Sequence, residues 1–212
     1  MTHGRRHPTM IMVVILVLAT VAACSAGTGG TTPTASTAVA TPTPAPVSSP
    51  AGTGRPSPES SPRVTLDQAW ATAELVDVST GATFRIADHA GKVIVIETMA
   101  IWCSNCRVQQ GDVKAALERL PADSVVYVVL DVDPNEDGAS LSAYRDKNSF
   151  VGRYAIAGAT VARALAAEFG DQFLNPPSTP MAVVGTDGIV TLTEFGHKSP
   201  DEIVALVTAH GA

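Results

Sequence analysis

The sequence predicts an α/β domain in which helices cover both faces of a central mixed sheet. The first observation is a pair of nearly continuous apolar runs, 93–98 and 125–132, which are rich in β-branched residues and typical of strands buried on both faces. The second is that helix-compatible segments alternate with these runs, as in parallel βα units. The third is a late hairpin signal followed by one more helix. Parallel units followed by a hairpin require a sheet of mixed direction.

Two hairpins are expected, one before and one after the βα units. Each joins two short strand-forming runs across residues that favour turns. The N-terminal hairpin is an extra element ahead of the main sheet. The hairpins join 73–76 to 83–86, with Ser79, Thr80 and Gly81 in the turn, and 181–185 to 189–194, with Asp187 and Gly188 in the turn.

Capping residues predict where the helices begin and end. Thr160 is the expected N-cap of one helix, and Gly170 is its expected C-terminal stop. Ser199 and Glu202 form a capping box for the last helix, with Pro200 at its first position. The other expected helices are 103–120, which ends before Pro121, and 140–147, and a short strand is expected at 154–157.

The N-terminus predicts export and attachment to a membrane. Arg5 and Arg6 precede an apolar run, 10–21, which has the pattern of a secretory signal and is shorter than a membrane span requires. Val21-Ala22-Ala23-Cys24 resembles the bacterial lipobox, in which the cysteine becomes the lipidated first residue of the mature protein. We therefore expect a signal peptide over 1–23 and a lipid on Cys24. An ordinary secretory signal and an uncleaved anchor are the alternatives.

The composition changes sharply after the signal. Residues 24–62 are nearly all Thr, Pro, Ser, Ala and Gly, so they are expected to form a disordered tether. Residues 63–212 are enough for one domain with a proper core. This part is acidic, and its Lys and Arg residues do not cluster with aromatic residues, which argues against a nucleic-acid surface. A monomeric domain without a cofactor is expected.

Cys103 and Cys106 are the residues that most clearly suggest chemistry. They stand in Trp102-Cys103-Ser104-Asn105-Cys106, directly after the first buried run, and the only other cysteine is Cys24. An exported chain lies where disulfides persist, so the pair is a candidate redox dithiol. A permanent disulfide and half of a zinc site are the alternatives. Zinc usually takes four ligands, and no second Cys-x-x-Cys or close Cys/His cluster exists.

The order of elements, Trp-Cys-x-x-Cys at the first strand-to-helix junction and Thr179-Pro180 before the late hairpin together resemble the thioredoxin fold. The resemblance covers 73–212 and is specifically to the membrane-tethered TlpA/ResA-type thiol:disulfide oxidoreductases. It implies that Pro180 is cis and that the backbone of Thr179 pairs with an extended client segment. Trp102 is expected to pack beside the dithiol and shield it, and the alternative is that it is a simple core aromatic residue.

The positions of the two cysteines predict different roles. Cys103 at the start of a helix lies near unpaired backbone N–H groups and the positive end of the helix dipole, which stabilise a thiolate. It is therefore the expected nucleophile. Cys106 lies one turn further on the same helix face and is the expected resolving residue, which attacks Cys103 in a mixed disulfide.

Glu97 is the candidate proton carrier. It ends a run of β-branched residues six positions before Cys103, where thioredoxins carry a buried acid. A buried carboxyl group can accept the proton of Cys106 because desolvation raises its pKa. The alternative is that Glu97 lies at the end of the strand and reaches solvent or a lysine. TlpA/ResA-type proteins often carry an acid three residues after the second cysteine, where this chain has Gln109.

Three functional classes are considered. The first is an exported thiol:disulfide oxidoreductase, and the second is a Sco-type copper-binding chaperone. The Sco family uses a Cys-x-x-x-Cys spacing and a histidine before the late hairpin, where this chain has Ser178-Thr179-Pro180. The third is a peroxiredoxin-like peroxidase, which needs a threonine where this chain has Ala100. Named residues therefore disfavour both alternatives.

The remaining expectations concern partners and other polar residues. The resemblance implies client proteins with cysteines and a membrane thiol-disulfide electron donor, most often in a reducing role such as cytochrome c maturation. The expected location is the extracytoplasmic face of the bacterial cytoplasmic membrane. His197 is expected at the surface. The acidic segment 131–137 does not match the spacing of an EF-hand and is expected to be a solvated loop without metal.

Overall fold

The computed structural model describes residues 65–212, which contain a five-stranded mixed sheet in the order β5-β4-β3-β6-β7. β3, β4 and β5 are parallel, whereas β6 and β7 run antiparallel to β3 and to each other. The strands are β3 (Val93–Met99), β4 (Val125–Asp131), β5 (Arg153–Ile156), β6 (Met181–Val184) and β7 (Val190–Leu192). The predicted signal peptide, the lipid on Cys24 and the predicted tether lie outside the described residues.

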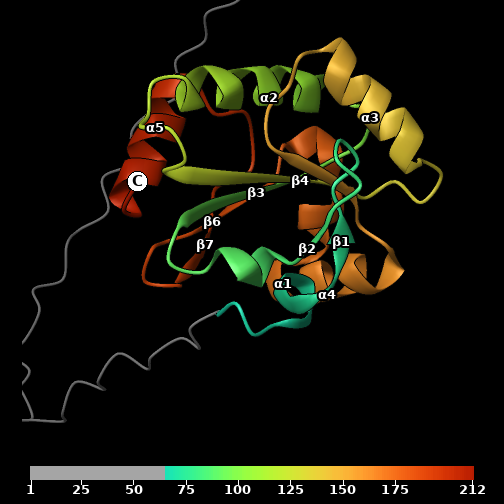
Figure 1. The fold of residues 1–212 in the computed structure, drawn as a ribbon, viewed down its shortest axis with the longest axis horizontal. Coiled ribbons are helices and arrows are strands. Elements are labelled where there is room, and N and C mark those ends of the chain that lie inside the picture. The colour runs from blue at the N-terminus through green and yellow to red at the C-terminus, as the bar shows by residue number, and fades with distance from the viewer. Residues whose placement is uncertain (1–64) are drawn as a thin grey trace, which may run out of the picture. The chain divides into compact units, whose positions relative to one another are not determined.

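Helices cover both faces of this sheet, so the predicted fold class is confirmed (Figure 1). One face packs against α2, α3 and α5, and the other against α1 and α4. The helices are α1 (Ala69–Thr72), α2 (Ser104–Leu117), α3 (Gly138–Lys147), α4 (Ala159–Phe169) and α5 (Pro200–Ala209). Three short 3-10 helices are η1 (Ile86–His89), η2 (Asp171–Leu174) and η3 (Pro176–Ser178).

The alternation of side chains along β3 builds the two cores. Val93, Val95 and Met99 point to the face with α2, and Ile94 and Ile96 point to the opposite face. All seven residues of β3 are buried, as the continuous apolar run predicts for a strand covered on both sides. The carboxyl end of β3 leads directly into the turn before α2, which is where the two cysteines lie.

Both predicted hairpins are present. The N-terminal one consists of β1 (Leu75–Val76) and β2 (Thr83–Phe84), which form a separate two-stranded antiparallel sheet. The predicted capping box of α5 is also present, because Ser199 accepts a bond from Glu202 N and the Glu202 carboxylate accepts one from Ser199 N. Gly170 ends α4 with a φ of 84°, a conformation that glycine adopts at little cost.

Three helix boundaries differ from the prediction, and one of them is the start of α3, which lies at Gly138 rather than at residue 140. Thr160 is not the N-cap of α4, because the helix begins at Ala159 and Gly158 occupies the cap position. Glycine is an acceptable N-cap, although it offers no side-chain oxygen to the first N–H groups. α2 ends at Leu117 rather than at Leu120, and its last turn continues as isolated turns before Pro121. The end of a helix is less well defined than its middle because the last turn lacks intrahelical partners.

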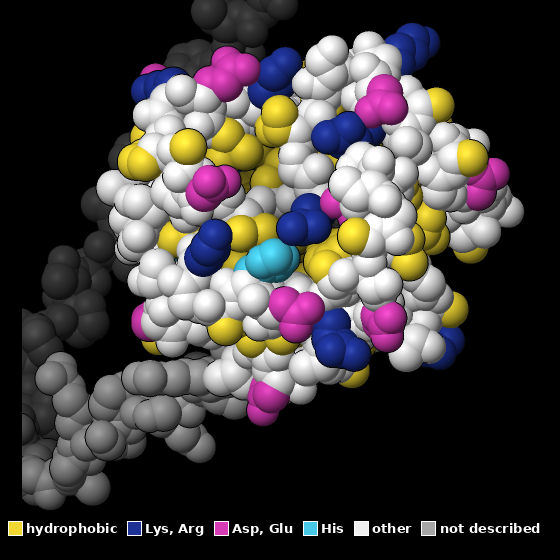
Figure 2. Space-filling view, viewed as in Figure 1, with side chains coloured by type: hydrophobic (Ala, Val, Ile, Leu, Met, Phe, Trp, Pro, Cys, Tyr) yellow, Lys and Arg dark blue, Asp and Glu magenta, His cyan; other side chains and the backbone are white. Residues whose placement is uncertain are grey.

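The surface of the described domain mixes charges of both signs. Figure 2 shows acidic and basic side chains interspersed over one face, with apolar side chains between them. Among residues 65–212, no helix combines the length and the apolar character that crossing a membrane requires.

Candidate dithiol site

Cys103 is the N-cap of α2, so the strand-to-helix turn itself positions its sulfur. Its backbone is extended, with φ −75° and ψ 107°, and its N–H is bonded to Ala100 O. The Cys103 Sγ accepts a hydrogen bond from Cys106 N at 3.1 Å, in the way that a serine oxygen caps a helix. The same N–H group stabilises negative charge on this sulfur when the pair is reduced.

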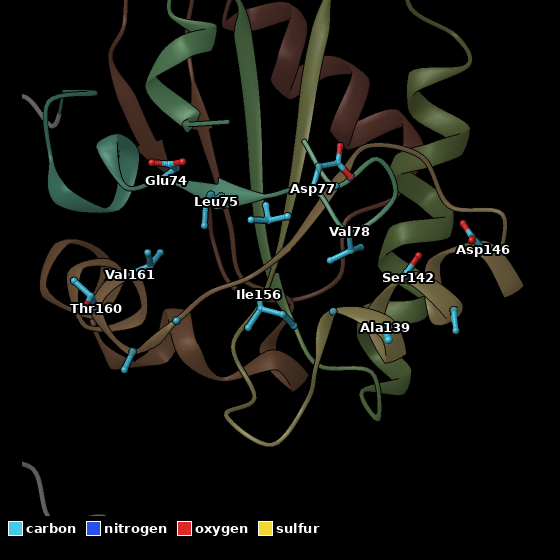
Figure 3. Close-up of a pocket in the computed structure, with 16 residues that line it drawn as sticks. Glu74, Leu75, Asp77, Val78, Ala139, Ser142, Asp146, Ile156, Thr160 and Val161 are labelled. Carbon is cyan, nitrogen blue, oxygen red and sulfur yellow. The ribbon is translucent and has the colours of Figure 1, made fainter. Parts of the chain in front are cut away.

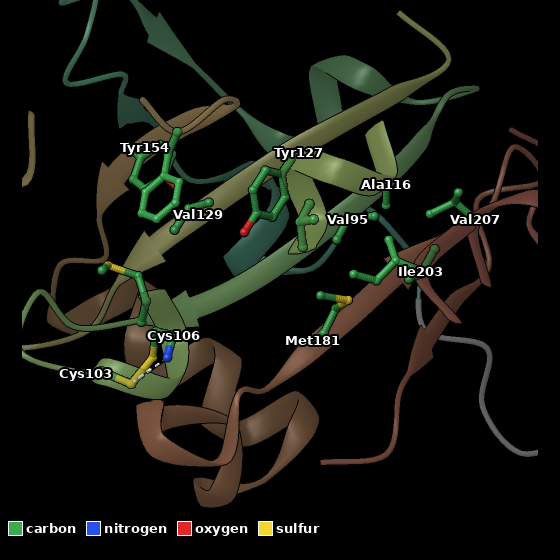
Figure 4. Packing of buried hydrophobic residues seen from close by; sticks show 14 of the residues in the cluster. Val95, Cys103, Cys106, Ala116, Tyr127, Val129, Tyr154, Met181, Ile203 and Val207 are labelled. Carbon is green, nitrogen blue, oxygen red and sulfur yellow. Dashed lines mark hydrogen bonds between the residues drawn. A yellow bond between two sulfur atoms is a disulfide. The ribbon is translucent and has the colours of Figure 1, made fainter. Parts of the chain in front are cut away.

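Cys103 and Cys106 form a disulfide with a Cα–Cα distance of 5.3 Å (Figure 4). Their surroundings differ. Cys103 is 3% exposed and Cys106 is 0% exposed, so a thiolate from a client can approach only Cys103. Cys106 Sγ lies 3.2 Å from the carbonyl oxygen of Pro176. A carbonyl oxygen accepts a bond from a thiol and repels a thiolate, so this contact favours the protonated form of Cys106 in the reduced protein.

The loop between β4 and α3 holds the turn that precedes the cysteines. Glu136 Oε2 accepts a bond from Ile101 N at 2.8 Å, and Asp133 Oδ2 accepts one from the Trp102 indole N–H at 2.7 Å. Both bonds connect segments about thirty residues apart in the chain. The acidic loop therefore holds the residues just before Cys103 in place.

The prediction that this acidic loop is solvated is wrong for its first residue. Asp131 is fully buried, and burial together with the neighbouring Glu136 raises its pKa to about 8. The reason is its position at the end of β4, paired in register with Met99 of β3, inside the sheet. Among the described residues, no cluster of three or more His, Cys, Asp or Glu side chains could hold a metal ion.

Trp102 lies beside the dithiol but is not a core aromatic residue. It is 60% exposed, and its indole N–H is bonded to Asp133. The other tryptophan, Trp70, is buried on the opposite face of the sheet. Trp102 therefore offers a large apolar surface to solvent immediately before Cys103, where a client segment would approach.

The loop before β6 lies against the disulfide but differs from the prediction in its backbone. No cis peptide bond occurs in residues 65–212, so the predicted cis bond before Pro180 is wrong. The physical reason is that Thr179 makes the turn itself, in a left-handed conformation with φ 44° and ψ 59° after η3. Its N–H is bonded to Pro176 O at 2.9 Å, so pairing of the Thr179 backbone with a client would use the carbonyl.

A groove runs beside the dithiol between α2 and this loop. It encloses about 320 Å³. The Asn105 amide donates to Pro177 O at 3.0 Å and thereby joins the two walls. At the rim, His197 is half-exposed, as predicted, and its Nε2 lies 2.6 Å from Asp112 Oδ2. The lining residues are Asn105, Val108, Pro177, Thr179, Gly196 and His197.

A second cavity lies apart from the dithiol. It encloses about 980 Å³ between the N-terminal hairpin and the first turns of α3 and α4 (Figure 3). Leu75, Val78 and Ile156 contribute apolar walls, and Glu74 and Asp146 lie at its edge. It shares no lining residue with the groove beside the cysteines. The dithiol site and this cavity are therefore separate features of the domain.

Glu97 is fully buried, so the alternative that it reaches solvent is wrong. Its Oε2 accepts a hydrogen bond from the Tyr127 hydroxyl at 2.5 Å, while its Oε1 has no partner of normal geometry. Burial raises the pKa of Glu97 to about 8, and the Tyr127 hydroxyl, the Gln110 amide and the positive charge of Lys198 act in the opposite direction. A carboxyl group with this pKa can both take up and release a proton near neutral pH.

Two glutamines of α2 have roles that the sequence alone does not reveal. Gln109, which occupies the position of the acid in TlpA/ResA-type proteins, is buried and bonds to both Lys198 N and Lys198 O. It fixes the loop before α5 rather than carrying protons. Gln110 is buried beside Glu97 and accepts hydrogen bonds from two tyrosine hydroxyls. The only signal for Gln110 is its position four residues after Cys106, on the same face of the helix.

Solved structures of proteins described as thiol:disulfide exchange proteins are similar to this fold. One is a thiol:disulfide interchange protein of the thioredoxin family from Chlorobium tepidum TLS. It is 20% identical, with a TM-score of 0.56 over 65% of this chain and 92% of that chain. Another is a secreted Mycobacterium tuberculosis disulfide oxidoreductase homologous to E. coli DsbE. It is 18% identical, with a TM-score of 0.51 over 66% of this chain and 97% of that one.

These similarities establish the fold. Residues 65–212 form a thioredoxin-like domain that carries a Cys-x-x-Cys disulfide at the start of α2. No protein-family model matches the chain, and no curated protein does. At identities of 20% or less, the activity of this chain has to be argued from its own residues.

Proposed function

We propose that this chain is an exported, membrane-anchored thiol:disulfide oxidoreductase that exchanges its Cys103–Cys106 pair with cysteines of client proteins. The observation that carries the proposal is the asymmetry of the pair. Cys103 caps α2 and accepts a backbone N–H bond, whereas Cys106 is fully buried against the carbonyl oxygen of Pro176. A purely structural disulfide would not need surroundings that stabilise a thiolate at one cysteine and a protonated thiol at the other once the pair is reduced.

The exchange follows from these positions. In the reducing direction the Cys103 thiolate attacks a client disulfide, forms a mixed disulfide and releases one client thiolate. Cys106 then loses its proton and attacks Cys103 Sγ, which closes the internal disulfide and releases the second client thiolate. Two electrons pass to the client. Glu97 is the proposed acceptor of the Cys106 proton.

The groove beside the dithiol is the proposed client site. Trp102 and Val108 expose apolar surface at its margins, with exposed fractions of 60% and 56%. Thr179 and Pro180 follow the turn that holds Pro176 against Cys106. An extended segment lying between α2 and this turn would bring its cysteine to Cys103.

The membrane anchor and the reducing role are further parts of the proposal. The lipobox ending at Cys24 and the signal-like residues before it support attachment to the extracytoplasmic face of the bacterial cytoplasmic membrane. A protein tethered there would be kept reduced by a membrane thiol-disulfide donor and would act on exported clients, as in cytochrome c maturation. Radiolabelled palmitate would be incorporated by the parent chain and not by a Cys24→Ala variant.

A redox titration of the purified chain tests the proposed activity. The thiols of Cys103 and Cys106 would be labelled after equilibration in glutathione or dithiothreitol buffers of known potential. One reversible two-electron transition supports the oxidoreductase. A potential near or below about −220 mV supports a reductant, whereas one near about −120 mV indicates a disulfide-forming oxidant. If no reversible transition occurs, the pair is a structural disulfide and the proposal is lost.

A further inference from the structure

A buried polar network surrounds Glu97, with one residue from each of five elements. Glu97 of β3 accepts the hydroxyl bond of Tyr127 of β4 at 2.5 Å. Gln110 Oε1 of α2 accepts bonds from Tyr154 of β5 at 3.0 Å and from Tyr144 of α3 at 3.2 Å. The chain contains three tyrosines, and all of them are in this network.

The network lies on the face of the sheet that carries the cysteines. Along β3, Val95 and Met99 pack in the same core as Cys106, so Glu97 between them points to that side. Gln110 lies one helical turn after Cys106 on the same face of α2. In Figure 4 the Tyr127 ring extends from β4 with its hydroxyl oxygen directed toward the end of the sheet where the disulfide lies.

The bonds leave one carboxyl oxygen available. Tyr127 occupies Oε2 of Glu97, and Oε1 is buried without a hydrogen-bond partner of normal geometry. Gln110 shows the complementary arrangement, because two hydroxyls occupy its Oε1 and its amide Nε2 is buried without such a partner. A buried polar atom without a partner is costly, so structures keep few of them. Here the two unpartnered atoms belong to neighbouring groups, one of which exchanges protons in the proposed reaction.

Among residues 65–212, the charged and titratable groups that face Glu97 are Tyr127, Tyr144 and Tyr154 on the neighbouring elements and Lys198 before α5. Burial lowers the pKa of Lys198, and the negative charge of Glu97 opposes that change. Because the tyrosines are neutral near neutral pH, Tyr127 and Gln110 are the nearby neutral groups that stabilise the Glu97 carboxylate.

We propose that Tyr127 and Gln110 are positioning residues that hold the Glu97 carboxyl group with Oε1 free to exchange a proton with the Cys106 thiol. This inference rests on the proposed function for its purpose. Tyr127 fixes one oxygen by donating to it. Gln110, with its own carbonyl held by Tyr144 and Tyr154, lies beside the carboxylate and stabilises its negative charge without a hydrogen bond of normal geometry to Oε1.

The direct test is the titration of Glu97 in the full chain. Carbon-13 NMR of labelled glutamate would follow the carboxyl group against pH, with Glu97→Gln assigning the signal. Tyr127→Phe removes one hydroxyl and the bond to the carboxylate, so the midpoint should rise by about one pH unit. Gln110→Met should raise it in the same direction.

A matched core variant separates positioning from general damage. Val207→Ala removes buried atoms from the same core on α5, an element that contributes no residue to the network. It should lower stability and leave the midpoint of Glu97 unchanged. If Tyr127→Phe moved the midpoint no further than Val207→Ala does, the positioning role of Tyr127 would be overturned.

A second readout connects Glu97 to the thiol. In a Cys103→Ser background, ultraviolet absorbance of the Cys106 thiolate would be followed against pH, with a Cys103→Ser/Cys106→Ser chain subtracted to remove Cys24. The Cys106 titration should shift in the Tyr127→Phe chain as Glu97 does. An unshifted thiol beside a shifted carboxyl group would overturn the inference. Neither readout needs exchange with a client, so failure of the proposed function would appear separately, as an absence of exchange in the parent.

Discussion

The sulfur of Cys106 lies 3.2 Å from the carbonyl oxygen of Pro176, seventy residues away in the chain. This contact joins α2 to the turn before Pro180 and gives the buried cysteine an acceptor for its thiol proton. The Asn105 amide makes a parallel connection to Pro177 O at 3.0 Å. Together the two contacts bring the dithiol and the proposed client loop into one site.

Substitution of the two cysteines should have different consequences. Cys103→Ser removes the accessible sulfur, so disulfide exchange should fall to the uncatalysed rate. Cys106→Ser keeps the nucleophile but removes the group that resolves the mixed disulfide, so covalent complexes with clients should accumulate. Non-reducing gels after incubation with a disulfide-bonded substrate check both outcomes. Equal trapping by both variants would contradict the assigned roles.

Glu97 should make the domain less stable as pH rises. Its pKa in the folded protein, about 8, lies above the ordinary value of 4.5, so the folded state binds this proton more tightly than the unfolded state. Its contribution is therefore complete below about pH 4.5 and is lost as pH rises through about 8. Urea unfolding of the parent and Glu97→Gln chains should diverge across this window, by on the order of a few kcal/mol. Parallel pH profiles would contradict the raised pKa.

Asp131 should also make the domain less stable as pH rises. Burial and the adjacent Glu136 raise its pKa from 3.8 to about 8, so its protonated form also stabilises the fold. Asp131→Asn keeps the shape of the side chain and removes the titration. The variant should lose part of the fall in unfolding free energy between about pH 4 and 8, measured by urea unfolding. Asp123→Asn, at an exposed position, is the matched control and should leave the profile unchanged.

Gln109 should contribute to stability rather than to proton transfer. Its side chain is buried and makes two hydrogen bonds with the backbone of Lys198, which precedes α5. Gln109→Leu leaves both backbone groups without these partners and should lower the free energy of unfolding by about 2 kcal/mol. Chemical denaturation measures this loss, and Val108→Ala at the exposed neighbouring position should have little effect. A change in the pH dependence of exchange would instead argue for a catalytic role.

Asn105 should affect client binding more than folding. It lines the groove and ties α2 to Pro177 O, but its side chain is exposed. Asn105→Ala should therefore raise the KM for a disulfide-bonded protein substrate several-fold with a smaller change in kcat. An insulin reduction assay over a range of substrate concentrations separates the two constants. A fall in kcat at constant KM would place Asn105 in the chemical step instead.

Local signals in the sequence determined much of this molecule. The apolar run 93–98 marks a strand covered on both faces, and Asp187-Gly188 and the Ser199 capping box mark a hairpin and a helix start. The position of Cys103 at the strand-to-helix junction also follows from the sequence. These features depend on residues that are near neighbours in the chain, so the sequence pattern is sufficient to predict them.

The tertiary structure decided which distant residues meet at the site. No periodicity predicts that Tyr127, Tyr144 and Tyr154 converge on Gln110 and Glu97, because each comes from a different strand or helix. The predicted cis bond before Pro180 is absent, and Thr179 turns the chain in a left-handed conformation directly after η3, which contacts α2. Buried polar groups need partners, and those partners are supplied by the fold rather than by adjacent residues.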